Sequence, residues 1–194
     1  MKSTYDAFMS FFEKRELGTQ RQILMQSAKG RVLEIGSGTG VNLKYYDFQG
    51  IDSLILSDFK LNPQLSTQVK KLNQDSINIK SFSVESLPFE DDSFDTVVVT
   101  LVFCSVYNVS NGLNEIKRVL KNDGKFIFIE HVLPEKQPLK ELFNTVTPIW
   151  KVLASNCHLN RDFLESLNES GFDYELNKRF FKTAFVSGIA KSSN

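Results

Sequence analysis

The sequence predicts an α/β fold in which helices cover both faces of a mostly parallel sheet. Two observations lead to this prediction: apolar segments of strand length alternate with segments of helical periodicity, and a glycine-rich loop separates the first strand from the next helical segment. A third is the apolar segment 96–106, which is rich in β-branched residues and about half as long as a membrane-spanning helix. This segment therefore predicts a central strand that is buried on both faces.

An amphipathic helix is predicted at the start of the chain. Tyr5, Phe8, Met9 and Phe12 recur at helical spacing, and such an apolar stripe must pack on another part of the protein. We expect residues 1–194 to form a single domain, with a helical segment at about 1–28 that is a candidate lid over a binding site.

The strands and helices of the domain then follow in alternation. Strands are expected at 31–36, 53–58, 77–84, 94–102 and 125–132, and helices at about 41–46, 61–72 and 111–120. The residues 122–124, Asn-Asp-Gly, predict a turn before the fifth strand. Parallel strands that are joined through helices require right-handed crossovers.

The pattern changes after Pro134. A longer helix is expected to reach about residue 154, and Asn160 is expected to cap another helix that ends near residue 170. Two strands at 172–179 and 182–190 then predict a terminal hairpin.

Composition limits the classes of function. The 194 residues include 23 basic and 23 acidic side chains, so the net charge is zero and no nucleic-acid partner is expected. The N-terminal segment lacks the apolar region of a secretory signal, so a cytoplasmic location without a stable membrane anchor is expected. Cys104 and Cys157 lie outside any CxxC spacing, which indicates neither a disulfide framework nor a metal site.

A glycine-rich loop and an acidic residue mark a candidate binding site. Gly36-Ser37-Gly38-Thr39-Gly40 follows the first strand, where its backbone can approach a ligand closely, although a plain tight turn is an alternative. Val41 stands where the dinucleotide fingerprint GxGxxG has its third glycine, which weakens an NAD interpretation. Asp58 ends the second strand and can accept hydrogen bonds from both hydroxyls of a ribose; a surface acid or a helix N-cap is the alternative.

Four segments together resemble the class I S-adenosylmethionine-dependent methyltransferases. They are VLEIGSGTG (32–40), Asp58, VESLPFEDDSFDTVVV (84–99) and EIKRVLKNDGKFIFIEH (115–131). TLVFCSV (100–106) and NCHLNRD (156–162) resemble more narrowly the thiol methyltransferases, also called methyltransferase-like protein seven, and their bacterial relatives. The resemblance implies a three-layer, doubly wound, Rossmann-like sheet of seven strands with an antiparallel C-terminal pair, and S-adenosyl-L-methionine as the cofactor.

The resemblance also implies where the cofactor lies. The methionine part would contact Glu34, Gly36, Ser37 and Gly38, with Asn42 as a weaker candidate. Asp58 would hold the ribose, Phe59 would cover the adenine, and the adenine edge would meet Ser83, Val84 and Glu85. Ser83 stands where many such enzymes have an aspartate. Thr100 and Leu101 would lie beside the sulfonium.

Few side chains are candidates for the chemistry, because methyl transfer depends mainly on positioning. His131, at the end of the fifth strand, is the catalytic candidate, and its alternative is a histidine that hydrogen-bonds a loop carbonyl. Candidates for the substrate pocket are Tyr5, Cys104, Trp150 and His158, each of which is otherwise an ordinary core or loop residue. No metal is expected, since these cysteines and histidines lack paired ligand spacing.

These observations predict methyl transfer from S-adenosylmethionine to a small, largely apolar acceptor. A thiol is favoured by the resemblance, and a thiol ionises appreciably near neutral pH. A phospholipid amine and a quinone ring remain open as acceptors. A non-catalytic nucleotide-binding module and an NAD-binding oxidoreductase remain open as other classes of protein.

Overall fold

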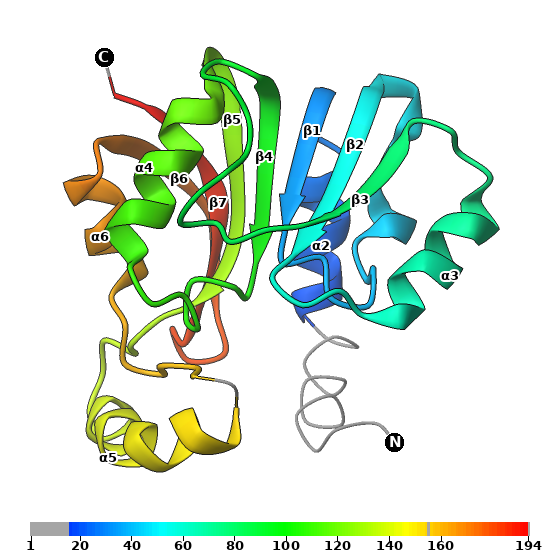
Figure 1. Cartoon of the computed structure of the whole chain (residues 1–194). Helices are drawn as coiled ribbons and strands as arrows, with labels where there is room; N and C mark the ends of the chain where they lie inside the picture. Colours follow the sequence, from blue (N-terminus) through cyan, green and yellow to red (C-terminus); the bar gives the residue numbers. More distant parts are fainter. Residues whose placement is uncertain (1–15, 155, 194) are drawn as a thin grey trace.

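A computed structural model describes residues 16–154 and 156–193 of the chain. Seven strands form one sheet in the order β3-β2-β1-β4-β5-β7-β6 (Figure 1). They are β1 (Gly30–Ile35), β2 (Ile51–Asp58), β3 (Ile77–Ser81), β4 (Phe94–Thr100), β5 (Leu120–His131), β6 (Phe172–Phe180) and β7 (Phe185–Ser192). The first five strands pair in parallel, whereas β7 is antiparallel to both β5 and β6. The predicted mostly parallel sheet with an antiparallel C-terminal pair is confirmed.

Helices cover both faces of the sheet. They are α2 (Gly18–Met25), α3 (Pro63–Leu72), α4 (Val109–Val119), α5 (Leu139–Leu153) and α6 (Phe163–Glu169), with 3-10 turns η2 (Leu43–Tyr45) and η3 (Phe48–Gly50). The buried side chains of α4 and α6 pack on one face, and those of α2 and α3 pack on the other. Helix α5 lies beyond the carboxyl end of β5, apart from these layers (Figure 1). The predicted N-terminal stripe lies outside the described residues.

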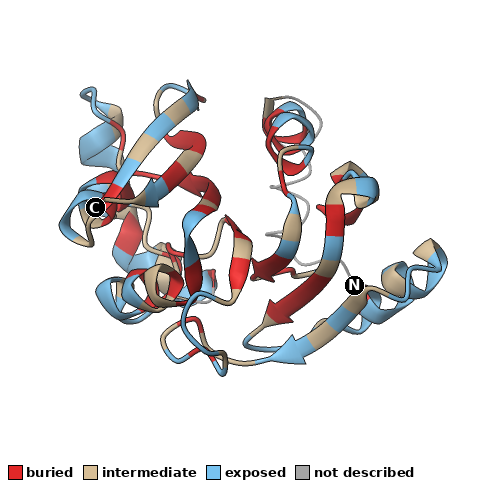
Figure 2. Ribbon diagram, turned by 90° about the horizontal axis from the view of Figure 1, so that it is seen from above, coloured by how far each residue is buried: buried red, intermediate tan, exposed pale blue. Residues whose placement is uncertain are grey.

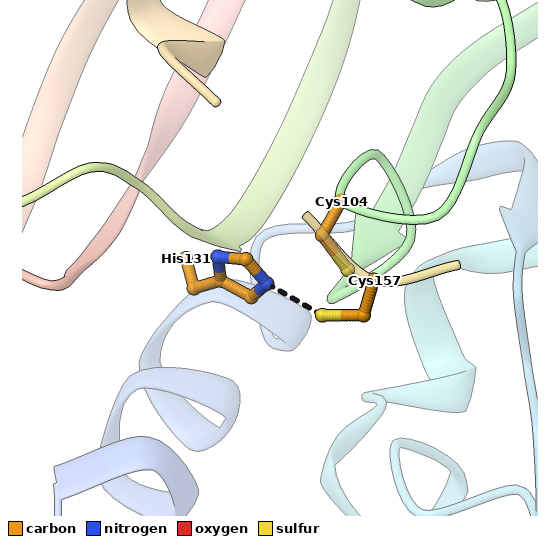
Figure 3. Close-up of side chains that lie close together, drawn as sticks. All are labelled: Cys104, His131 and Cys157. Atoms are coloured by element: carbon orange, nitrogen blue, oxygen red, sulfur yellow. Dashed lines mark hydrogen bonds between the residues drawn. The ribbon is translucent and has the colours of Figure 1, made fainter. Parts of the chain in front are cut away.

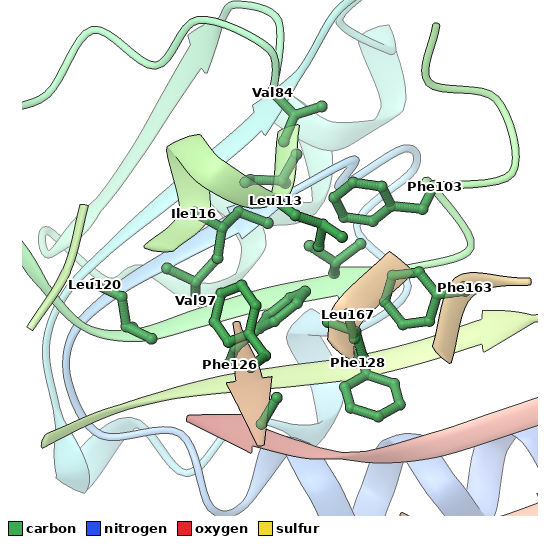
Figure 4. Close-up of a cluster of buried hydrophobic side chains, with 14 of the residues drawn as sticks. Val84, Val97, Phe103, Leu113, Ile116, Leu120, Phe126, Phe128, Phe163 and Leu167 are labelled. Atoms are coloured by element: carbon green, nitrogen blue, oxygen red, sulfur yellow. The ribbon is translucent and has the colours of Figure 1, made fainter. Parts of the chain in front are cut away.

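Strand β4 shows why the centre of the sheet is so apolar. Successive side chains of a strand point to opposite faces, and Val97 and Val99 belong to the core under α4 and α6, whereas Val98 belongs to the core under α2. The same α4 core contains the neighbouring rings of Phe126 and Phe128 on β5 (Figure 4). Buried residues accordingly follow the central strands, and exposed residues lie on the outer surfaces (Figure 2).

Two strands end earlier than their sequence patterns indicate. β4 ends at Thr100 rather than at residue 102, because Leu101 has a left-handed backbone with φ 59°, which turns the chain away from the sheet. β3 ends at Ser81 rather than at residue 84. Val84 lies beyond it and packs in the core on the α4 face.

The predicted turn at 122–124 lies within β5. β4 pairs with β5 at Leu120 and then next at Lys125, so the residues between them form an irregularity in the strand. The turn residues therefore produce a bulge, and the helix before them connects to the strand without a separate loop.

Two helical predictions also change. The helix expected at 41–46 is only the 3-10 turn Leu43–Tyr45. Asp162, rather than Asn160, caps α6, because its carboxylate accepts a hydrogen bond of 3.1 Å from the Glu165 backbone N–H.

Arg118 on α4 holds the segment that precedes β4. Its guanidinium donates hydrogen bonds to both carboxylate oxygens of Glu115, to Asp91, and to the carbonyls of Leu87 and Phe89, at 2.7–3.0 Å. The hydrogen bond from Arg118 is the main reason that the pKa of the Glu115 carboxyl lies below its ordinary value.

We therefore expect Arg118→Met to lower the free energy of unfolding by about 1–3 kcal/mol, since charge-assisted hydrogen bonds are lost. A carboxyl with a lowered folded pKa stabilises the protein above its ordinary value of 4.5, and this contribution disappears as the pH falls through the folded pKa. Urea unfolding at neutral and acidic pH measures both effects. Lys121→Met, which removes an exposed ion pair with Asp95, is the control and should change stability by less than about 1 kcal/mol. An Arg118→Met protein as stable as the wild type would contradict the prediction.

Candidate active site

The site lies at the carboxyl edge of the sheet. β1 is flanked by β2 and β4, and all three run in the same direction, so their carboxyl ends meet at one edge. From β1 the chain continues to β2 and β3 on one side, and then returns to β4 on the other side of β1. The carboxyl ends of β1 and β4 therefore lie at the topological switch point of the sheet. Open α/β sheets bind their ligands in the crevice at such a point.

The glycine loop after β1 approaches its surroundings at two glycines. Gly36 has φ 73°, and a Cβ atom there would lie 2.1 Å from a methyl carbon of Val102, so a side chain would push apart the loop and the segment after β4. Gly38 has φ 52°, and a Cβ atom there would meet no atom within 4 Å. The backbone at Gly38 therefore faces open space, where a ligand can approach it.

Asp58 connects this loop to the end of β2. Its Oδ2 accepts a hydrogen bond of 3.0 Å from the Gly38 N–H, and its Oδ1 accepts one of 3.2 Å from the Lys60 N–H. The neighbouring ring of Phe59 is 81% exposed. A half-buried carboxylate, an exposed aromatic ring and an open glycine together fit a ribose that carries a flat base. Ser37, which is buried, also ties the loop to β2, because its N–H donates a hydrogen bond of 2.9 Å to the Ser57 carbonyl.

A buried polar network lies beneath the glycine loop. Glu34 is 1% exposed, and its two carboxylate oxygens accept hydrogen bonds from Asn42 Nδ2 at 2.9 Å and from the Tyr46 hydroxyl at 2.7 Å. Arg21 on α2 donates to Asn42 Oδ1 at 2.5 Å and to Thr100 Oγ1 at 2.9 Å. Burial raises the pKa of Glu34, whereas these hydrogen bonds and the charge of Arg21 oppose that shift. The network thereby joins α2, β1 and the end of β4.

The structure thus gives Glu34 and Asn42 a supporting position under the loop. Sequence reasoning grouped both with the cofactor site but missed Arg21 and Tyr46. Neither of these belongs to a recognisable motif, and only the fold shows that the Arg21 side chain is buried beside an acid.

The residues expected at the adenine edge lie after β3. The Ser83 hydroxyl accepts a hydrogen bond of 3.2 Å from the Glu85 N–H. Glu85 Oε1 in turn accepts from the backbone N–H groups of Tyr107 and Asn108, at 3.0 and 3.2 Å, just before α4. Glu85 therefore ties this segment to the start of α4, and its carboxylate is already partly engaged within the protein.

Glu130 fixes the loop that follows β4. Its Oε1 accepts hydrogen bonds from the N–H groups of Val102 and Phe103, at 2.8 and 3.2 Å, and the side chain is fully buried. Burial raises the pKa of its carboxyl to about 7. Sequence reasoning assigned Glu130 no role in the site. The available signal was an acid within an otherwise apolar strand.

An apolar cavity of about 470 Å³ lies between the end of β5 and α5. His131 and Trp150, both predicted as site residues, line it, and so does Leu101, whose neighbour Thr100 is the last residue of β4. Its remaining walls are mostly aliphatic or aromatic side chains, with Cys157 and Lys182 as polar exceptions. No carboxylate occurs among the described residues that line it.

The other predicted pocket residues lie elsewhere. The His158 ring does not line this cavity; its Nδ1 lies 2.8 Å from the Asn156 carbonyl oxygen and 3.2 Å from that of Cys104. Cys104 lies behind the wall rather than in it. Tyr5 lies outside the described residues.

The structure brings Cys104, His131 and Cys157 together beside this cavity (Figure 3). His131 Nε2 lies 3.0 Å from Cys157 Sγ, and the two sulfur atoms and a ring nitrogen all lie within 4.8 Å of one another. The Cys104 thiol and the His131 ring lower the pKa of Cys157, while the nearby Cys157 side chain and burial raise the pKa of Cys104. The three residues are far apart in the sequence, so no motif spacing revealed the cluster.

Comparisons with known proteins agree with this geometry. A family described as a methyltransferase domain matches residues 33–128. Human thiol S-methyltransferase TMT1A is 33% identical over 168 residues, which are 82% of this chain and 67% of the relative. The ubiquinone/menaquinone biosynthesis C-methyltransferase UbiE of Citrifermentans bemidjiense is 29% identical over 123 residues, 61% of this chain and 52% of the relative. The crystal structure of Bacillus subtilis YcgJ has the same fold, with a TM-score of 0.73, 17% identity, and coverage of 93% of this chain and 99% of that one.

Among residues 16–154 and 156–193, no helix has both the length and the apolar character that a membrane crossing requires.

Proposed function

Because this chain belongs to the class I S-adenosylmethionine-dependent methyltransferases, we propose that it methylates the sulfur atom of a small apolar thiol. It is an enzyme, and S-adenosylmethionine is its methyl donor. The observation that carries the proposal is the apolar cavity, which is lined by Leu101 and by the His131–Cys157 pair.

We place the cofactor across the glycine loop and the end of β2. The carboxylate of Asp58 binds the ribose hydroxyls, the exposed ring of Phe59 covers the adenine, and the open backbone at Gly38 receives the methionine part. The support for this placement is the Asp58–Gly38 hydrogen bond, which holds the carboxylate beside the loop whose backbone is open at Gly38. The adenine edge meets the segment 83–85, whose serine hydroxyl and backbone lie after β3.

The acceptor occupies the apolar cavity. When bound, the cofactor supplies an activated methyl group. Leu101, which we expect beside the sulfonium, also lines the acceptor cavity. An apolar cavity excludes water but also disfavours an ionised thiol, because burial raises the pKa of an acid. The enzyme therefore needs a group that stabilises the thiolate, and we assign His131 to that role as the catalytic residue, since it lines the cavity and contacts Cys157.

A quinone ring is the second candidate acceptor. Phe143, Trp150 and Phe185 give the cavity aromatic walls, and UbiE, one of the relatives, is named for methylation in quinone biosynthesis. An amine head group is less favoured. No carboxylate lines the cavity within the described part of the chain, so a cationic head group would find no carboxylate partner there.

Two measurements test the proposal. We expect S-adenosylhomocysteine, at about 100 times its dissociation constant, to stabilise the protein by roughly 2.7 kcal/mol, and NAD to have no effect. Transfer of labelled methyl groups from S-adenosylmethionine to a series of small apolar thiols, quinols and amines then identifies the acceptor. Turnover of quinols but not of thiols would overturn the thiol assignment. Cofactor binding without turnover of any acceptor would indicate a non-catalytic binding module.

A further inference from the structure

We infer that Cys104, His131 and Cys157 bind a zinc ion, and that its fourth coordination position opens toward the acceptor cavity. This inference rests on the proposed thiol methylation for its catalytic role, but the binding of the ion stands on geometry alone. The three side chains come from separate segments: the loop after β4, the last residue of β5 and the loop after α5. Their ligand atoms all lie within 4.8 Å of one another (Figure 3).

The donor set selects the kind of ion. Two thiolates and one imidazole are soft to intermediate ligands, which favour zinc over magnesium or calcium. Catalytic zinc sites have three protein ligands and an open position for substrate, and Cys2His is one of the sets that enzymes use. His131 and Cys157 line the cavity, so an ion held by them would be accessible from it.

A divalent cation would also balance the charge of the cluster once both thiols have lost their protons. Cys104 and Cys157 are each 3% exposed, and His131 is 7% exposed. Two thiolates buried this deeply are costly without compensating charge. The two positive charges of a divalent ion balance the two negative charges of the thiolates. The His131 ring, as a neutral ligand, adds no charge.

The surrounding protein holds the two cysteine ligands in place. The Cys104 carbonyl accepts a hydrogen bond of 2.8 Å from the His158 N–H, and Glu130 binds the two preceding backbone N–H groups of the same loop. The Cys157 N–H donates to the Ala154 carbonyl at 3.0 Å. Such outer contacts orient ligands before an ion arrives.

The ion would replace the hydrogen bond that now closes the cluster. His131 Nε2 and Cys157 Sγ are 3.0 Å apart, whereas zinc–sulfur and zinc–nitrogen bonds of about 2.3 and 2.0 Å at a tetrahedral angle separate the two atoms by about 3.5 Å. A change of this size needs only side-chain rotation. Loss of the thiol protons accompanies binding, as for other thiolate sites.

The bound ion would stabilise the acceptor as a thiolate. The acceptor thiol gives its proton to the hydroxide that occupies the fourth position, water leaves, and the thiolate sulfur takes that position. A lone pair of this sulfur then attacks the methyl carbon of the cofactor. The bond from that carbon to the sulfonium breaks, its electron pair remains on the cofactor sulfur, and the neutral thioether departs from the ion. No oxidant or reductant is required.

The first test measures metal in the full-length protein, purified under reducing conditions. We expect about one equivalent of zinc per chain by mass spectrometry, and less than a tenth of that in Cys104→Ser, His131→Ala and Cys157→Ser. His158→Gln, the variant of the other histidine, should retain zinc. Cobalt substitution should give a sulfur-to-cobalt charge-transfer band that changes when a thiol is added, which is a readout independent of turnover.

The outcomes separate the two proposals. Zinc binding that the ligand variants abolish, without methylation of any thiol, would support the metal site and contradict the thiol acceptor. Methylation at the full rate by zinc-free protein would overturn the catalytic role of the ion and leave the acceptor standing. Absence of bound zinc after incubation with excess zinc chloride, or a disulfide between Cys104 and Cys157 in protein purified with reductant, would also overturn it.

Discussion

Replacement of Asp58 by alanine should weaken the binding of S-adenosylhomocysteine by about 100-fold. We assign this carboxylate two hydrogen bonds from ribose hydroxyls, and a charge-assisted hydrogen bond contributes about 1.5–3 kcal/mol. Loss of about 3 kcal/mol corresponds to a dissociation constant roughly 100 times larger. The same carboxylate also receives the Gly38 N–H, so its removal loosens the loop as well. Isothermal titration calorimetry measures the affinity directly.

The matched control for this prediction lies on the same strand. Asp52, near the opposite end of β2, is exposed and far from the carboxyl edge. Asp52→Ala should therefore bind S-adenosylhomocysteine like the wild type. Unchanged affinity in Asp58→Ala would remove the ribose assignment, and an equal loss in both variants would indicate a general effect on folding.

The fold could be predicted from the sequence because its local signals agree with the tertiary structure. Apolar segments that alternate with helical periodicity require a buried sheet between helices, and the valines of β4 supply such a segment almost without interruption. The glycine loop and Asp58 could be paired for the same reason. Each follows a parallel strand directly, and the carboxyl ends of neighbouring parallel strands always share an edge.

Element boundaries were harder to predict where tertiary contacts decide them. The left-handed Leu101 ends β4, although leucine has no local preference for that conformation. A hydrogen bond from its N–H to the Ile129 carbonyl on β5 accompanies that conformation. The turn signal at 122–124 was real, but pairing with β4 on both sides of it makes the segment a bulge.

The two clusters of buried polar side chains could not be predicted from local sequence patterns. Arg21 joins Asn42 and Thr100 across long sequence separations, and Cys104 meets Cys157 only because the loop after β4 lies against the loop after α5. Spacing rules recognise ligands that belong to one turn or hairpin. A site assembled from three separate segments of the chain has no such spacing.

Replacement of His131 by alanine should lower kcat for thiol methylation by at least about 100-fold, because the acceptor loses the group that stabilises its thiolate. The affinity for S-adenosylhomocysteine should change by less than about threefold, because His131 contacts Cys157 and the acceptor cavity rather than the glycine loop or Asp58.

Steady-state kinetics with a small apolar thiol, together with calorimetry on the same preparation, separate these two effects. His158→Ala is the matched histidine variant and should cause a smaller loss, since its ring does not line the cavity. The opposite pattern in Asp58→Ala, a weaker cofactor complex with a smaller effect on kcat at saturating cofactor, would show that the two ends of the site act separately. A His131→Ala enzyme that turns over at the wild-type rate would exclude this histidine from the reaction. It would also exclude a catalytic role for the proposed ion.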